Sequence, residues 1–425
     1  MPIFSSISSF FNRNKKRLLI AGGLTVSAYY LVDHFVLQKF RDFQNNLKQE
    51  MLFKEQIRRR FLQTQQDCHY TILALLPVLT DPVIEYLPVE LIAQALKVKK
   101  NNNNNSQQQL SSSNELTDSM LTTDNLNIHE NTENQQLQQY MGHLKTQLWN
   151  LLKIKTLTRS LSLLYSISGL LLITRLQLNI LARRSYLELA IVMAGGKLPA
   201  NENNQANYQI EQSYLSLSWW LLNNGWLAIT KMIEDLVIEK FSTINARTEV
   251  LLSDFNGILS EINQSIQQEH SQEIVACLFP NNYDNLITTL LNTNPNLVSE
   301  LDMSDSNFHK LISETNFLVN SDYFSELFFK LIKNSQETLF SNLCLFLNST
   351  VQPDKFELIN ENKKYKLANY LAQLSVQNGI MVDNNHEVNE FDDIGTELSG
   401  NIYINGLNAM EELDEFSASI YSNFE

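Results

Sequence analysis

Residues that break regular structure are scarce in this chain of 425 residues. It has 12 glycines and 8 prolines, which together make under ~5% of the chain against roughly 12% in average usage. An all-β fold needs many tight turns, so this scarcity argues against one and favours long helices. Because 44% of the residues are hydrophobic, the chain can form a sizeable core and is not mainly disordered.

Cysteines and positive charge are also limited. The three cysteines, Cys68, Cys277 and Cys344, are odd in number and widely spaced, which excludes a disulfide framework and a four-cysteine zinc site. Their small number fits a reducing compartment. The formal net charge of -14 disfavours nucleic acid as a partner.

The short sequence patterns of common enzymes are missing. The chain has no GxGxxG, GxxxxGK[ST], HExxH, CxxC or GxSxG pattern, and these patterns mark nucleotide, zinc and nucleophile sites. The seven histidines are scattered, and none has another His or Cys three or four residues away. We therefore expect no cofactor, no metal and no catalytic activity.

The positive charge that is present gathers at the N-terminus. Residues 1–60 contain eleven Lys or Arg and four acidic residues, a net charge of +7, so the remaining 365 residues carry -21. A basic cluster comes first: Arg13, Lys15, Lys16 and Arg17. A basic N-terminal segment followed by an acidic remainder indicates that the two parts of the chain lie in different surroundings.

An apolar run follows this basic cluster at 18–37. As a helix its twenty residues are ~30 Å long, which matches the hydrocarbon core of a bilayer. We predict a single transmembrane anchor at 18–37 after a short basic tail at 1–17. A cleaved signal peptide, a mitochondrial presequence and a buried core helix are the alternatives. Basic residues flank both sides of the run, so charge does not decide its orientation.

Helical spacing of apolar residues continues beyond the anchor. We predict a polar helix at 39–66, an apolar segment at 70–79 that is broken at Pro77, and a short helix at 91–100. Residues 101–138 are rich in Asn, Gln and Ser. Such a tract cannot bury enough apolar area to offset its ordering entropy, so we expect a disordered insertion.

The stretch 144–194 has the highest load of Leu, Ile and Val. Its uncharged part, 160–174, has only fifteen residues between Arg159 and Arg175. A second membrane span is the competing interpretation, but a run of this length is more often a buried core helix.

A helical wheel of residues 145–164 has two apolar faces. The first is a core-facing stripe of Leu151, Ile154, Leu157, Leu161 and Leu164, and the second carries Lys145, Leu148, Trp149, Leu152 and Lys153. Lysine is rarely buried deeply, so the second face is expected to reach solvent and to accept an amphipathic helix of a partner. Cover by another helix of the same chain is about equally compatible with the wheel.

Four blocks make the chain resemble the peroxin-3 family of peroxisomal membrane-protein biogenesis factors, in its yeast form. They are RNKKRLLIAGG at 13–23, KEQIRRRFLQTQQDCHYTILALLPVL at 54–79, LWNLLKIKTLTRSLSLLYSISGLLLITRLQLNIL at 148–181 and YLSLSWWLLNNGWL at 214–227. The resemblance implies an all-α, elongated helical bundle at 38–425 that faces the cytosol, behind a peroxisomal membrane anchor and a luminal tail.

The resemblance also implies a function in docking. The partner would be peroxin-19, the receptor for newly made peroxisomal membrane proteins, through an amphipathic helix at its N-terminus. The matching residues are Trp149, Lys145, Leu148, Leu152, Lys153 and Leu96. Peroxisomal membrane lipids and adaptors for peroxisome inheritance or degradation are further partners. A structural tether that binds those adaptors is the alternative function.

Overall fold

The computed structural model describes residues 38–104, 137–193, 204–303, 306–349, 364–384 and 401–423. The chain divides into two units, Met1–Gln63 and Thr64–Glu425. The predicted anchor at 18–37, its basic cluster and the stretch 105–136 of the polar tract lie outside the described residues. At the two ends of that tract, helix α3 continues through Asn104 and helical residues resume at 137.

Helices make up most of the described chain, which confirms the predicted all-α class. In chain order the helices are α2 (Gln38–Tyr86), α3 (Val89–Asn104), α6 (Lys145–Met193), α7 (Asn204–Leu215), η2 (Ser216–Ser218), η3 (Leu221–Gly225), α8 (Trp226–Lys240), α9 (Leu252–Glu269), α10 (Ser271–Leu278), α11 (Tyr283–Thr293), η4 (Pro295–Asp302), α12 (Asn307–Val319), α13 (Asp322–Ser349), α14 (Leu367–Val382), α15 (Ile402–Asn408) and α16 (Glu411–Tyr421). Strands β1 (Glu249–Leu251) and β2 (Lys364–Lys366) pair antiparallel, with Val250 opposite Tyr365.

The predicted break at Pro77 is wrong, because α2 continues through Pro77 and Pro82 to Tyr86. Each proline lacks the N–H that would bond the carbonyl four residues earlier, which normally weakens a helix interior. Here Leu76 and Leu79 are fully buried in the main core. Packing of this face therefore outweighs the two lost hydrogen bonds.

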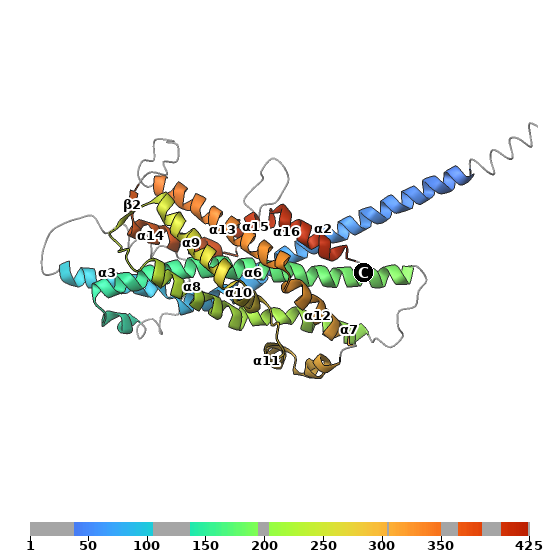
Figure 1. The fold of residues 1–425 in the computed structure, drawn as a ribbon, viewed down its shortest axis with the longest axis horizontal. Coiled ribbons are helices and arrows are strands. Elements are labelled where there is room, and N and C mark those ends of the chain that lie inside the picture. Colours follow the sequence, from blue (N-terminus) through green and yellow to red (C-terminus); the bar gives the residue numbers. More distant parts are fainter. Residues whose placement is uncertain are drawn as a thin grey trace, which may run out of the picture. The chain divides into compact units, whose positions relative to one another are not determined.

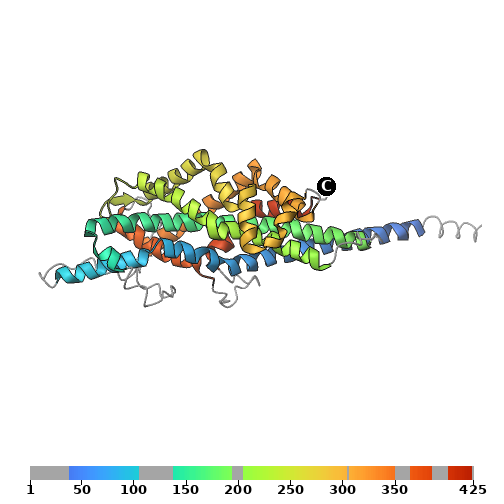
Figure 2. The same ribbon diagram turned by 90° about the horizontal axis from the view of Figure 1, so that it is seen from below.

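Helix α6 is the centre of the second unit. It contacts α3, α8, α13, α14 and α16, and Figures 1 and 2 show α8, α13 and α14 alongside it. Every residue from 156 to 177 is buried. A helix that is apolar on all sides needs such cover on all sides.

Two described segments, Lys54–Lys99 and Lys145–Val192, are long and apolar enough to cross a membrane by length and composition. The most apolar window of the second is 94% buried within the chain. The prediction that 144–194 holds a core helix is therefore confirmed. The window of the first segment is 50% buried.

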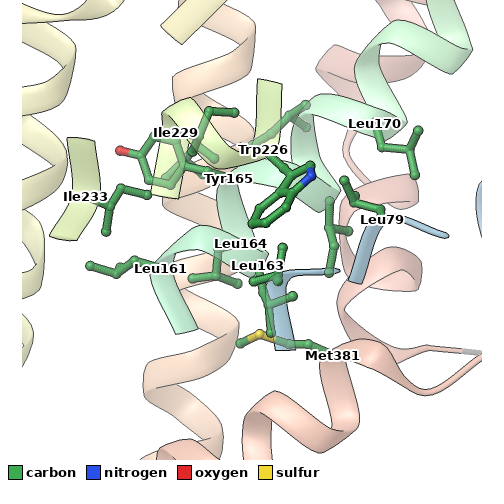
Figure 3. Close-up of a cluster of buried hydrophobic side chains, with 14 of the residues drawn as sticks. Leu79, Leu161, Leu163, Leu164, Tyr165, Leu170, Trp226, Ile229, Ile233 and Met381 are labelled. Atoms are coloured by element: carbon green, nitrogen blue, oxygen red, sulfur yellow. The ribbon is translucent and has the colours of Figure 1, made fainter. Parts of the chain in front are cut away.

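The core at the middle of α6 joins four helices, as Figure 3 shows. The labelled side chains are Leu79 from α2, Leu161, Leu163, Leu164, Tyr165 and Leu170 from α6, Trp226, Ile229 and Ile233 from α8, and Met381 from α14. Segments that lie up to three hundred residues apart in sequence thus share one continuous apolar interior.

Buried arginines fix α6 against its neighbours. The Arg159 guanidinium donates to both carboxylate oxygens of Glu90, at 2.5 and 2.7 Å, and to the Leu87 carbonyl at 2.7 Å. These bonds bind α6 to the turn between α2 and α3, through Leu87, and to the first turn of α3, through Glu90. A bidentate pair with matched geometry sets the relative position of the helices that carry it.

Candidate partner-binding surface

Five of the six residues predicted to bind a partner lie in the first turns of α6. Lys145 is exposed, and Trp149 is half-buried with its ring packed against the main core. Leu148 and Leu152 are only 0% and 1% exposed. The sixth residue, Leu96 of α3, is 2% exposed and belongs to the same core, and α3 contacts α6.

The expected solvent-facing second face is therefore wrong for Leu148, Leu152 and Lys153. Lys153 is 3% exposed. The competing possibility, cover by other helices of the same chain, is the one observed. In the predicted core stripe, by contrast, Leu151 and Ile154 are only half-buried.

The burial of Lys153 has a specific cause. Its ammonium donates to the carbonyls of Phe241, at 2.6 Å, and Ile244, at 2.7 Å, just beyond the last residue of α8. Carbonyls at a helix C-terminus lack intrahelical donors and carry partial negative charge. Burial nevertheless lowers the pKa of Lys153, because the ammonium loses water. Lys153 thus fastens α6 to the end of α8.

A group of partly exposed apolar side chains lies in the residues just before α6 and in its first turns. We call it the Trp149 cluster, and its members are Leu137, Tyr140, Met141, Leu144 and Trp149. All but Leu144 are half-buried and pack against the main core, and Leu144 is 67% exposed. The Lys99 ammonium donates to the His143 carbonyl, which holds this segment beside α3. Burial raises the pKa of Tyr140, so its hydroxyl remains neutral.

Sequence reasoning missed four members of this cluster, although a signal was present. Leu137, Tyr140 and Met141 follow the spacing i, i+3, i+4, which is typical of one apolar helix face, whereas Leu144 lies beyond the end of that helical segment. The preceding polar tract concealed it, since residues up to 138 were assigned to the insertion.

This arrangement suits binding to another protein rather than catalysis. A partly exposed Trp with Leu, Met and Tyr around it offers apolar area, and aromatic residues often dominate interface energetics. Methionine adapts its shape to varied partners. Lys145 adds an exposed positive charge beside this area, which would favour acidic residues of a partner helix.

The cysteines and histidines form no metal site in the described part of the chain, where no group of three potential ligands gathers. None of the three cysteines, which all lie in the described part of the chain, forms a disulfide. Burial raises the pKa of Cys68 to about 12 and that of Cys277 to about 11. Both thiols therefore remain protonated at neutral pH and are weak nucleophiles.

The structure defines an all-α protein with a partly exposed apolar surface at the start of its central helix. The family model of Peroxin-3 matches residues 9–423, and the chain belongs to the Peroxin-3 family. It is 56% identical to Peroxisomal biogenesis factor 3 of Debaryomyces hansenii, with 100% of both chains covered. It is 32% identical to Peroxisomal membrane protein PEX3 of Komagataella phaffii, over 98% of this chain and 99% of the relative.

A third relative, Peroxisomal biogenesis factor 3 of Yarrowia lipolytica, is 27% identical over 98% of this chain and 99% of its own length. The predicted family is thus confirmed. Membership assigns the chain to the peroxisomal membrane, to peroxisome biogenesis and to the import of peroxisomal membrane proteins.

Proposed function

We propose that the chain is a membrane-anchored docking factor that binds the amphipathic N-terminal helix of peroxin-19. The observation that supports this function is the Trp149 cluster, an apolar surface on an ordered helical core. An amphipathic helix lays its apolar face into such a surface, and the gain comes from removing both apolar faces from water.

In this proposal some of the predicted residues contact the partner, and the others support the surface from within the fold. Trp149 contacts the partner helix, and Lys145 attracts its acidic positions. Leu148, Leu152 and Leu96 lie beneath the surface and hold its shape. Lys153 is bound to the end of α8, so its part is to position α6 rather than to contact the receptor.

A titration of the receptor's N-terminal peptide against the full chain in lipid nanodiscs tests the docking site. A hot-spot Trp contributes about 2–4 kcal/mol of binding, so Trp149→Ala should weaken the complex roughly 30- to 1000-fold. Tyr208→Ala is the matched control, because Tyr208 is an aromatic residue of α7 with 65% exposure. Wild-type affinity in Trp149→Ala would refute this site.

The same proposal places the anchor at 18–37, the basic tail 1–17 in the lumen and residues 38–425 in the cytosol. Arg13, Lys15, Lys16 and Arg17 would then assist targeting to the peroxisomal membrane. Alkaline extraction of membranes tests the anchor. The chain without residues 1–37 should appear in the soluble fraction, and its retention in the pellet would contradict a single anchor.

A further inference from the structure

The second half of α2, from Thr64 to Tyr86, presents one straight exposed face. Helix positions spaced by three or four residues share a side. The most apolar window of Lys54–Lys99 is only 50% buried, whereas that of α6 is 94% buried. The exposed side chains along this side are, in order, Asp67, Tyr70, Ala74, Val78, Asp81 and Glu85. We call these six residues the α2 outer face.

The centre of the α2 outer face is apolar and uncharged. Tyr70 is 62% exposed and Val78 is 52% exposed, and the small Ala74 lies between them. The Tyr70 ring stands edge-on to the His69 ring, with the ring centroids 5.9 Å apart. Asn408 Nδ2 of α15 in turn donates to His69 Nδ1 at 3.0 Å. These contacts order Tyr70 at the surface, which lowers the entropy cost of binding a partner there.

Carboxylates flank this apolar centre at both ends. Asp67 lies one turn before Tyr70, and Asp81 and Glu85 lie one and two turns after Val78. Between 61 and 86 the chain has no lysine or arginine. Burial raises the pKa of Asp81, because its carboxylate loses water. The α2 outer face therefore carries three negative charges and no positive charge of its own.

The cations that reach this part of α2 from α6 are already neutralised by other residues. The pairs are Arg159–Glu90, Arg175–Asp414 and Lys155–Glu234. Among the residues that the structure describes, no ion pair involves a carboxylate of the α2 outer face. Pro82 adds a further acceptor, because it has no N–H to donate to the Val78 carbonyl. The face thus offers hydrogen-bond acceptors and uncompensated negative charge around an apolar centre.

We propose that the α2 outer face docks a basic amphipathic helix of a partner protein. The apolar stripe of that helix covers Tyr70, Ala74 and Val78. Lysine or arginine near one of its ends pairs with Asp67, and basic residues near the other end pair with Asp81 and Glu85. Asp67 and Asp81 are fourteen residues apart, about 21 Å along a helix, so the basic groups of the partner stand about four turns apart. A membrane surface fits less well, because these carboxylates repel anionic lipids.

Fluorescence anisotropy with the full chain in nanodiscs of neutral lipid tests this proposal. The probe is a labelled, end-blocked alanine-based helix of about twenty residues, with a leucine stripe in its middle and two arginines near each end. Its control peptide has glutamine in place of each arginine. We expect the arginine peptide to bind about fivefold more tightly, since three exposed ion pairs together contribute about that much. This preference should decrease as salt is added.

Two matched triple variants separate the site from the general negative charge of the chain. The first removes the carboxylates of the α2 outer face and should bind the two peptides about equally; its changes are Asp67→Asn, Asp81→Asn and Glu85→Gln. The second removes three exposed carboxylates of α9 and should keep the preference for arginine; its changes are Asp254→Asn, Glu261→Gln and Glu269→Gln. Both variants alter the net charge by the same amount, so only position distinguishes them.

A single substitution tests the apolar centre. Ala74→Lys places a long, positively charged side chain where the partner helix would lie, and it should weaken binding of the arginine peptide at least about tenfold. Alanine and lysine are both good helix formers and Ala74 is exposed, so the fold should be kept. The peroxin-19 peptide should bind Ala74→Lys as it binds wild type, which distinguishes this face from the Trp149 cluster.

Four results would overturn the proposal. The first is equal binding of the arginine and glutamine peptides to wild type. The second is an equal loss of preference in the two triple variants, which would indicate a diffuse charge effect. The third is unchanged binding of the arginine peptide to Ala74→Lys. The fourth is a dimer of the full chain in detergent that Ala74→Lys dissociates, which would assign the face to a second copy. A melting temperature for each variant confirms that it is folded.

Discussion

The middle and the start of α6 differ although both are rich in leucine. From 156 to 177 every residue is buried, whereas Leu144, Lys145 and Trp149 at the start remain open to water to different extents. The difference comes from what surrounds the helix, because α14, α13 and α16 reach the middle through the pairs Ser160–Asn378, Ser168–Ser335 and Arg175–Asp414. One helix thus acts as the core of the fold and, at its first turns, supplies a surface.

The buried ion pair in the middle region should produce the largest effect. Arg159→Met removes the partner of Glu90 and the donor to the Leu87 carbonyl. Breaking a buried pair from one side costs about 3–5 kcal/mol, because the remaining charge stays partly buried. Urea denaturation should show this loss in the free energy of unfolding. Arg59→Met, at an exposed pair with Glu55, should change it by under about 1 kcal/mol.

Neighbouring leucines at the start of α6 give the next largest effect. Leu152 is buried and Leu151 is half-buried, so Leu152→Ala should cost about 2–4 kcal/mol and Leu151→Ala clearly less. The helical wheel alone predicts the opposite, a larger loss of stability for Leu151→Ala than for Leu152→Ala. Denaturation of the two variants side by side therefore decides between the wheel and the observed packing. A larger loss for Leu151→Ala would contradict the burial described here.

The sequence was sufficient to predict the all-α class and a buried core helix within 144–194, which in the structure is part of α6 (Lys145–Met193). Low Gly and Pro content and a continuous apolar pattern are local properties. The effect of Pro77 was misjudged because the hydrogen bond lost at this proline is outweighed by the packing of α2 against the core. That packing involves residues far away in the sequence, so no local pattern shows it. The polar tract similarly obscured the helical spacing of Leu137 and Tyr140.

The exposed face of α6 was misjudged for a comparable reason. Lys153 was taken as a mark of solvent, but its ammonium finds the carbonyls of Phe241 and Ile244. Those acceptors are about ninety residues away, and only the C-terminal end of α8 brings them to α6. No local pattern contains this information, so burial of a lysine could not be predicted from the wheel.

A pH titration tests that burial of Lys153 directly. Its pKa is lower in the folded chain than the ordinary value of 10.5, because burial disfavours the ammonium form. Between the two pKa values the unfolded chain binds more protons, so the free energy of unfolding rises with pH in that window. Relative to Lys153→Met, the wild type should gain stability as pH rises toward about 10.5. Lys231→Met controls for the loss of one charge, and a falling or flat difference would contradict the assignment.

The smallest effect on stability is expected at Leu144, where stability and binding should change in opposite directions. Leu144 directly precedes α6, its carbonyl accepts the Leu148 N–H at 3.0 Å, and its side chain is 67% exposed. Serine is favoured at such an N-cap position, by about 0.5–1 kcal/mol over residues that cannot cap. Leu144→Ser should therefore leave the free energy of unfolding unchanged or raise it slightly.

The same substitution should weaken docking of the peroxin-19 peptide. It removes exposed apolar area from the Trp149 cluster worth about 1 kcal/mol of contact, which is roughly a fivefold loss of affinity. Leu144→Ala separates the two effects, because alanine loses the contact without gaining a cap. Leu291→Ser changes a leucine of α11 with 57% exposure and should bind the peptide normally. If Leu144→Ser and Leu291→Ser bind equally well, Leu144 lies outside the docking surface, and the apolar contact is confined to the residues that pack against the core.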